Sequence, residues 1–175
     1  MKKGVVIWFT SFSGAGKTTI CGKLVAVLRK RGEQVEMLDG DLFRMNFSND
    51  IGYSESERFK NIERAVYVAK LLSKNGIVVL ASFFTPYQRM RDYCRKELPD
   101  YVKVYVKCSL KECIRRDVKG LYSKALKGEI QHFTGISDPF EEPVLPDLIL
   151  DTEKSQLDEN VELVINFLKQ HKYTS

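Results

Sequence analysis

The stretch Ser11–Thr19, "SFSGAGKTT", decides the fold. It follows the phosphate-binding loop pattern G-x-x-x-x-G-K-[ST] except at the first position, which is Ser11. An apolar run, "VVIWF", precedes it and an amphipathic segment follows, as a strand–loop–helix unit requires. In such a loop, backbone N–H groups and a helix N-terminus converge on phosphate oxygens. The sequence therefore predicts a nucleotide cradle formed by Ser13, Gly14, Ala15, Gly16, Lys17, Thr18 and Thr19.

Three residues of this loop have separate expectations. Lys17 should reach the β- and γ-phosphates, and the Thr18 hydroxyl should ligate Mg²⁺. Ser11 lies at the exit of the predicted strand, where a small residue suffices unless φ is positive. We therefore expect a working loop, with at most modestly weaker nucleotide binding.

The length and composition predict one globular domain spanning residues 1–175. Of the residues, 43% are hydrophobic and 29% are charged, which is ordinary for a soluble protein. No apolar run approaches the roughly 20 residues of a membrane helix, and the first residues do not resemble a signal peptide. The cysteines lack C-x-x-C spacing, so we expect reduced thiols in a cytoplasmic protein at Cys21, Cys94, Cys108 and Cys113.

Apolar runs alternate with helical patterns along the chain. Buried strands are predicted at Val5–Phe9, Val35–Leu38, Ile77–Ala81, Val102–Val106 and Leu148–Leu150. Helices are predicted at Thr18–Arg31, Ser56–Asn75, Pro86–Leu98, Leu110–Asp117 and Leu157–Gln170. This order predicts an α/β fold of the P-loop NTPase type, with three α/β/α layers and a mainly parallel five-stranded sheet. The region from about 119 to 146 has no strand pattern and is expected to be a mobile lid.

The second predicted strand ends in "LDGDLFR", Leu38 to Arg44. In an extended chain, Asp39 and Asp41 would point the same way, with Gly40 permitting a turn. Beside a phosphate loop, such carboxylates can accept a hydroxyl proton and orient hydrated Mg²⁺, and Arg44 can clamp an anion. The structural alternative is an Asp-Gly turn with a helix cap.

Further polar and aromatic residues accompany the next predicted elements. In "GYSESERFKNIERA", Ser54 to Glu57 form a capping box, and Arg58, Asn61 and Arg64 share one helical face. Tyr53 is either a core residue or a platform for a base. The third strand ends in "ASFFTPYQRMR", which contains Thr85, Arg89 and Arg91, and the predicted lid contains Lys119 and Phe133, with Arg116 just before it. Each group can also be explained without a function, as a solvated helix face or a surface loop.

The net charge of +5 requires nucleic acid to be considered as a partner. Basic residues gather between Lys103 and Lys127. A solvated helix face or a site for small polyanions explains them as well, so we expect no nucleic-acid partner and no membrane partner.

Together these motifs resemble the adenylylsulfate kinase (APS kinase) family. The resemblance runs from about Val6 to Thr152 and rests on "IWFTSFSGAGKTT", "LDGDLFR", "GYSESERFKNIER", "SFFTPY", "RDVKGLYSKALKGEI" and "FTGISDPFEEP". It implies that ATP phosphorylates the 3′-hydroxyl of adenosine 5′-phosphosulfate (APS), giving PAPS and ADP for sulfate activation, with Mg²⁺ as cofactor. It also implies a homodimer.

The resemblance assigns roles residue by residue. Lys17, Asp39 and Asp41 would be catalytic, with Asp39 as the base that also orients the metal ion. Arg116 would cover the ATP adenine, and Tyr53 and Phe133 would sandwich the substrate adenine. The implied substrate-binding residues are Asp41, Arg44, Tyr53, Arg58, Asn61, Phe84, Thr85, Lys119, His132 and Phe133.

The chain departs from the family pattern at several positions. Ser11 replaces glycine, Tyr53 replaces Phe, and Gln88 and Met90 replace charged residues. Thr85 stands where the family has a serine that is sometimes assigned as a phosphorylated intermediate. Direct in-line transfer needs no covalent step, so we expect Thr85 to position substrate rather than to accept phosphate.

Two alternatives remain open from the sequence. The chain could phosphorylate another small nucleotide or metabolite, which the two aromatics and "FTGISDP" disfavour. It could also be a regulatory nucleotide-binding module without catalysis, which the retained Lys17, Thr18, Asp39 and Asp41 disfavour.

Overall fold

Strand β1 (Val5–Thr10) is the centre of the fold, and each of its residues is buried. The computed structural model describes residues 4–174 and places β1 between β3 (Val78–Ser82) and β4 (Tyr101–Lys107). With β2 (Val35–Asp39) and β5 (Leu148–Asp151), these strands form one sheet in the order β2-β3-β1-β4-β5. All four pairings are parallel, so the carboxyl ends of the strands share one edge.

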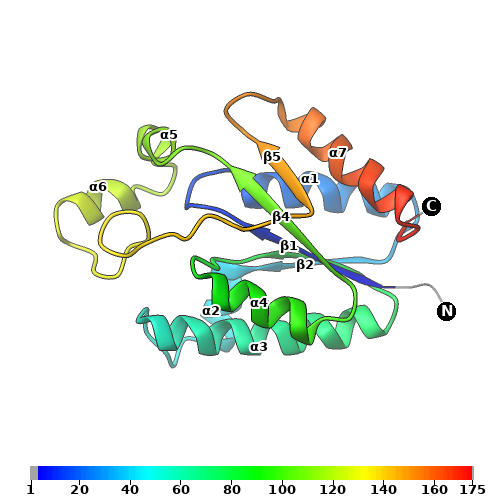
Figure 1. The fold of residues 1–175 in the computed structure, drawn as a ribbon, viewed down its shortest axis with the longest axis horizontal. Coiled ribbons are helices and arrows are strands. Elements are labelled where there is room, and N and C mark those ends of the chain that lie inside the picture. The colour runs from blue at the N-terminus through cyan, green and yellow to red at the C-terminus, as the bar shows by residue number, and fades with distance from the viewer. Residues whose placement is uncertain (1–3, 175) are drawn as a thin grey trace.

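Helices cover both faces of this sheet (Figure 1). Successive side chains of β1 point to opposite faces, so each face of the sheet builds its own core. Ile7 faces a core shared with α1 (Lys17–Lys30) and α7 (Leu157–Gln170). Trp8 faces a core shared with α3 (Glu55–Lys74) and α4 (Gln88–Glu97). The expected three-layer α/β/α architecture is therefore confirmed.

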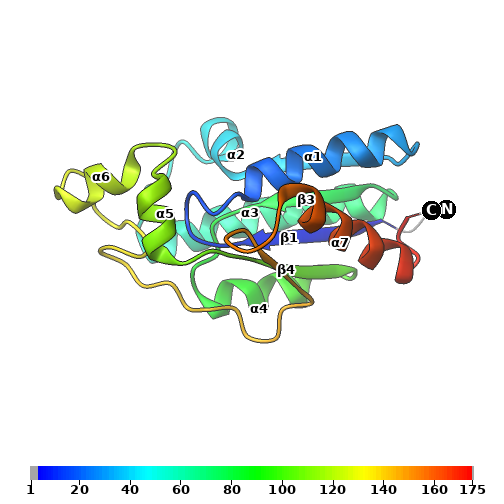
Figure 2. The ribbon, with the colours of Figure 1, turned by 90° about the horizontal axis from the view of Figure 1, so that it is seen from above.

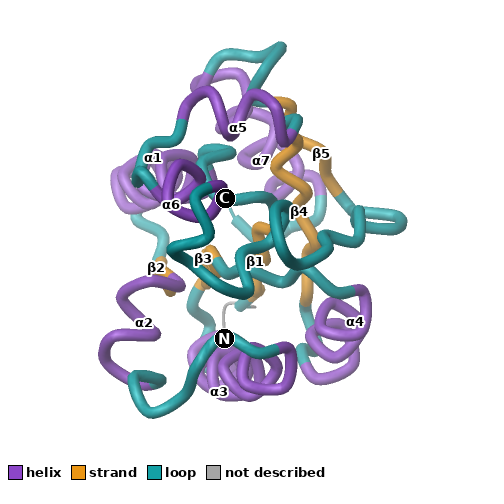
Figure 3. Tube along the Cα trace, turned by 90° about the vertical axis from the view of Figure 1, so that its left-hand side faces the viewer, coloured by secondary structure: helices purple, strands orange, loops and turns teal. Residues whose placement is uncertain are grey.

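The remaining helices lie at or beyond the carboxyl edge of the sheet. They are α2 (Gly40–Phe47), α5 (Leu110–Arg116) and α6 (Leu121–Leu126). Both Figure 1 and Figure 2 place α6 beyond the strand ends, and Figure 3 looks onto this end of the molecule. Segments far apart in the sequence therefore meet where β1, β2 and β3 finish.

Most predicted elements are confirmed to within two residues at each end. The five predicted strands are present, and α7 has the predicted bounds. The predicted terminating glycines, Gly32 and Gly76, have φ of 78° and 81°, so they can end the preceding helices where a side chain would be strained.

Two short helices depart from the expectation. The extended chain expected at "DGDLFR" is wrong, because α2 begins at Gly40 directly after β2. The region expected to lack regular structure contains α6, where Asp117 accepts hydrogen bonds from the backbone N–H groups of Tyr122 and Ser123. Both helices are too short for a hydrophobic period, and side-chain oxygens stabilise their first turns.

The four cysteines are free and buried. None of the helices within residues 4–174 combines the length and the apolar character needed to span a bilayer.

Candidate active site

The loop after β1 forms a backbone cradle. Gly14 and Gly16 have φ of 74° and 106°, a region that side chains rarely adopt, so glycine is required at both positions. Ser11 does not have a positive φ, so its side chain causes no backbone strain. The expectation that a small residue suffices at the strand exit is consistent with this backbone.

Lys17 begins α1 and is only 8% exposed. Its Nζ donates to Ser11 Oγ at 2.7 Å and to the Phe12 carbonyl at 3.2 Å, and it lies 4.8 Å from the centre of the Phe84 ring. Burial, and then the nearby charge of Lys119, lower the pKa of Lys17 from 10.5 to about 8. The ammonium therefore lies beside the cradle but is held by uncharged oxygens.

The hydroxyl of Thr18, in the cradle, and the carboxylate of Asp39, at the end of β2, lie side by side. The Thr18 hydroxyl donates to Asp39 Oδ2 at 3.3 Å. Asp39 Oδ1 accepts the backbone N–H groups of Asp41 and Leu42 at 3.0 and 3.1 Å, so Asp39 also caps α2. The structural alternative, a helix cap, is thus present, and it leaves the second carboxylate oxygen beside Thr18.

Gly40 and Asp41 define how α2 approaches the site. A Cβ at Gly40 would lie 2.8 Å from the Ser82 carbonyl oxygen, so a larger residue would push β2 and α2 away from the end of β3. Asp41, one residue into α2, forms an ion pair with Lys119 of the lid region. Asp39 and Asp41 therefore do not act as a parallel pair, because one faces Thr18 and the other faces the lid.

The start of α3 supplies cationic and amide groups. The predicted capping box is confirmed, with Ser54 and Glu57 bonded reciprocally. Two guanidiniums lie against the Tyr53 ring, that of Arg44 at 4.2 Å and that of Arg58 at 5.5 Å from its centre. Arg58 also donates to the backbone carbonyl of Tyr53 at 2.8 Å, which anchors the chain at the residue that the sequence offered as a platform.

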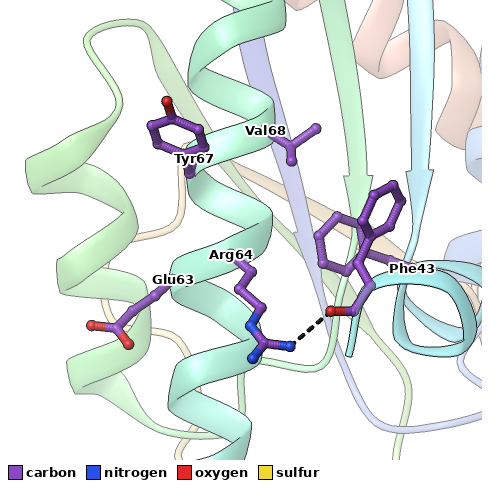
Figure 4. Close-up of a pocket in the computed structure, with 6 residues that line it drawn as sticks. Phe43, Glu63, Arg64, Tyr67 and Val68 are labelled. Atoms are coloured by element: carbon purple, nitrogen blue, oxygen red, sulfur yellow. Dashed lines mark hydrogen bonds between the residues drawn. The ribbon is translucent and has the colours of Figure 1, made fainter. Parts of the chain in front are cut away.

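The predicted polar face of α3 divides between two places. Arg58 and Asn61 line the main cavity described below. Arg64 instead donates to the Phe47 carbonyl at 2.7 Å and pairs with Asp50 at 2.6 Å. Figure 4 shows Arg64 beside Phe43 in a separate, mainly apolar groove of about 400 Å³ between α2 and α3.

The segment expected to form a lid, residues 119–146, lines the cavity opposite the start of α3. Its residue His132 has φ of 55° and accepts a hydrogen bond from Arg58 at its carbonyl oxygen. Phe133 packs edge-on against Tyr122 of α6, with ring centres 5.0 Å apart, and the Tyr122 hydroxyl donates to the Ser13 carbonyl at 2.9 Å. The lid aromatic is therefore connected through one tyrosine to the phosphate cradle.

The side chains that follow β3 lie in different places: some line the main cavity, and others are buried in the protein or form ion pairs elsewhere. Phe84 lines the main cavity, whereas Thr85 is fully buried and its hydroxyl donates to Thr10 Oγ1 at 2.8 Å. Arg91 is also buried and donates to the Thr85 carbonyl at 2.6 Å. Arg89 pairs with Glu55 at 2.7 Å, away from the cradle.

Arg116 lies behind the phosphate loop. It contacts Glu112 at 2.8 Å and donates to the Thr152 carbonyl at 3.0 Å. The Thr152 hydroxyl in turn donates to the Ala15 carbonyl at 2.8 Å. Thr152 and Tyr122 thus support the loop from outside it. Sequence reasoning missed both, because their hydrogen bonds join segments more than 100 residues apart.

The predicted site residues meet around one cavity of about 430 Å³. All except Ala15, Thr85 and Arg116 line it: Ser13, Gly14, Gly16, Lys17, Thr18, Thr19, Asp39, Asp41, Arg44, Tyr53, Arg58, Asn61, Phe84, Lys119, His132 and Phe133. Its cradle side offers N–H groups and an ammonium, and its far side offers guanidiniums and aromatic faces. Such a cavity suits an anionic ligand on its cradle side and an anionic ligand with an aromatic base on its far side.

Comparison with known proteins agrees with this geometry. The family described as adenylylsulphate kinase matches residues 3–151. A probable adenylyl-sulfate kinase from Pseudomonas aeruginosa is 51% identical over 93% of this chain and 76% of its own length. An adenylyl-sulfate kinase from Halothermothrix orenii is 45% identical over 98% of this chain and 93% of its own.

Solved structures give the same result. An APS kinase from Mycobacterium tuberculosis, in complex with AMPPNP and APS, superposes with a TM-score of 0.93 at 37% identity, covering 97% of this chain and 99% of that one. A gluconokinase from Sinorhizobium meliloti, at 16% identity and a TM-score of 0.58 over 97% of this chain and 93% of its own, shares the fold alone. The chain therefore belongs to the adenylylsulphate kinase family.

Proposed function

We infer that this protein transfers the γ-phosphoryl group of ATP to the 3′-hydroxyl of APS, giving PAPS and ADP. One observation carries the inference: the phosphate cradle lines the same cavity as most of the residues that the resemblance assigns to APS binding. The adenylyl-sulfate kinases that match nearly the whole chain support it.

The ATP side would be formed by the loop after β1. The N–H groups around Gly14 and Gly16 would hold the phosphates, and Lys17 would neutralise charge on the β- and γ-phosphates. A magnesium ion fits here because the Thr18 hydroxyl and the Asp39 carboxylate are adjacent oxygen donors of the kind that Mg²⁺ prefers. When bound, the ion would neutralise negative charge on the phosphates.

The APS side would be formed by α2, α3 and the lid. The base would stack between Tyr53 and Phe133, while Arg58 and Asn61 would hold the phosphosulfate. Asp41 and Arg44 would contribute to binding, and Lys119 would add positive charge from the lid. The lid, proposed as residues 119–146, would exclude the water that could otherwise hydrolyse ATP.

The transfer itself would be a direct displacement. The 3′-oxygen forms a bond to the γ-phosphorus as the bond from that phosphorus to the β–γ bridging oxygen breaks. The proton of the 3′-hydroxyl passes to the carboxylate of Asp39, and ADP leaves. Thr85 takes no covalent part, because its hydroxyl donates into the protein toward Thr10.

Mapping the product tests this function. We expect purified protein with Mg²⁺, ATP and APS to form ADP and a nucleotide phosphorylated at the 3′ position, identified by mass spectrometry and ³¹P NMR. A panel of unsulfated nucleotides and sugars serves as the control. Equal rates with these acceptors would favour another metabolite kinase, and binding without any turnover would favour a regulatory module.

Assembly and location are further parts of the proposal. A homodimer is proposed from the family resemblance, and light scattering would test it. An APS kinase from Thiobacillus denitrificans that aligns with 99% of this chain, and with 30% of its own, is hexameric, so assembly has to be measured for this chain. Work in the cytoplasm is proposed because the four buried thiols suit a reducing compartment.

A further inference from the structure

Ser11, which replaces the first glycine of the loop pattern, is fully buried at the end of β1. Its hydroxyl donates to the Phe12 carbonyl oxygen at 2.7 Å. The same Oγ accepts a hydrogen bond from Lys17 Nζ at 2.7 Å. Because the hydroxyl hydrogen is directed at Phe12, the oxygen presents its lone pairs to the ammonium.

This hydroxyl is one of the few partners of the buried ammonium within the described residues. Lys17 also donates to the Phe12 carbonyl at the longer distance of 3.2 Å, and the Phe84 ring faces its Nζ. A glycine at position 11 would leave only that carbonyl and the ring. A buried charge that loses a hydrogen-bond partner is strongly disfavoured, so the serine stabilises both the charged form and the position of Nζ.

We propose that Ser11 is a positioning residue that holds the Lys17 ammonium beside the phosphate cradle before the nucleotide binds. The proposal rests on the proposed function only in taking nucleotide phosphates as the ligand of Lys17. An ammonium has three donors, so Lys17 can keep its bond to Ser11 and turn a free donor toward a phosphate oxygen. The chain would thus gain a contact that a glycine at this position cannot make.

Three substitutions separate the hydroxyl from the backbone and from packing. S11A removes only the oxygen, S11G removes the whole side chain, and S11T keeps the hydroxyl. The dissociation constant of Mg·AMPPNP would be measured by calorimetry at neutral pH, with Lys17→Met as a reference for a lost ammonium and thermal melts to verify folding.

We expect S11A and S11G to bind AMPPNP up to about tenfold more weakly at neutral pH, with S11T close to wild type. Wild-type behaviour of S11A would overturn the proposal, and so would tighter binding by S11A and S11G, which would mean that Ser11 competes with phosphate. A loss in S11T equal to that in S11A would point to altered loop shape and would also overturn it.

This experiment is independent of APS turnover. If the protein failed to form PAPS, AMPPNP binding would still report on Ser11 and Lys17. If the Ser11 variants bound AMPPNP as tightly as the wild type, the proposal about Ser11 would fail. The conclusion that the protein forms PAPS would still stand.

Discussion

The two halves of the cavity are built in different ways. The cradle comes from one continuous stretch, residues 11–19, and works through backbone groups and buried side chains. The opposite half comes from α2, α3 and the lid, and its Tyr53 is 54% exposed. Phosphate recognition is thus fixed by local backbone geometry, whereas selection of the acceptor depends on side chains that only the tertiary fold brings together.

The two halves of the cavity also differ in the hydrogen bonds and ion pairs that stabilise them. Cradle residues are braced from behind by Thr152 and Tyr122, which donate hydrogen bonds to carbonyl oxygens of the loop. Within the acceptor half, α2 and α3 are joined to residues 119–146 by the Asp41–Lys119 ion pair and by the bond from Arg58 to the His132 carbonyl. The same segment is joined to the cradle by the buried hydrogen bond of Tyr122. Exposed polar links are weaker than buried ones, so we expect α2 and α3 to separate from this segment more readily than the cradle does.

The largest effect is expected where the two halves join, at Asp39. In D39N the amide oxygen can still accept the α2 backbone N–H groups, but the charge beside Thr18 and the proton acceptor are lost. We expect kcat for PAPS formation to fall by about 10²- to 10⁴-fold, measured by coupled ADP release. The control is D39A, which should show a similar rate and an additional loss of about 1 kcal/mol of stability from the missing cap.

Nearly unchanged turnover in D39N would contradict the idea that the cradle half and the acceptor half are joined at Asp39. It would mean that the acceptor hydroxyl needs no carboxylate from the end of β2. Unchanged binding of both nucleotides with slow turnover would instead place Asp39 at the chemical step.

A smaller and more selective effect is expected at Phe133, which belongs to the acceptor half alone. Phe133→Leu keeps apolar volume against Tyr122 but removes the aromatic face. Because stacking is worth about 1–3 kcal/mol per base, APS should bind roughly five- to 100-fold more weakly, while ATP affinity changes little. Separate calorimetric titrations with APS and AMPPNP measure this. Equal losses for both ligands would show that the two halves are not distinct in binding.

The smallest effect is expected at Thr85, which the fold places near the site but directs away from it. T85A removes the bond to Thr10 and should retain turnover within about tenfold, with a modest fall in melting temperature. T85S, which keeps the hydroxyl, is the matched control. Loss of all activity in T85A with both nucleotides still bound would revive a covalent intermediate.

The strands and longer helices were predictable because buried parallel strands are continuous apolar runs and long helices have a clear period. The cradle was predictable for a related reason, since its contacts are local. The start of α2 was not, because Asp39 both ends β2 and caps α2, and the eight residues of α2 are too few to show a hydrophobic period.

Contacts between distant segments were beyond the sequence. The resemblance placed Thr85 in the pocket wall, but the orientation of its hydroxyl depends on Thr10, which is 75 positions away. Arg64 shares a helical spacing with Arg58 and Asn61, yet Asp50 and the Phe47 carbonyl draw it into another groove. Periodicity gives the face of a helix, but neighbouring segments decide which partner each side chain finds.

The burial of all four cysteines has a practical consequence for spectroscopy. Burial raises the pKa of the Cys21 and Cys94 thiols, and that of Cys113 to about 12, so these sulfurs should react slowly with maleimide dyes. A single cysteine introduced at exposed Lys124 on α6 would then carry a fluorophore with little background labelling. Such a label would test in single molecules whether residues 119–146 move as the proposed lid.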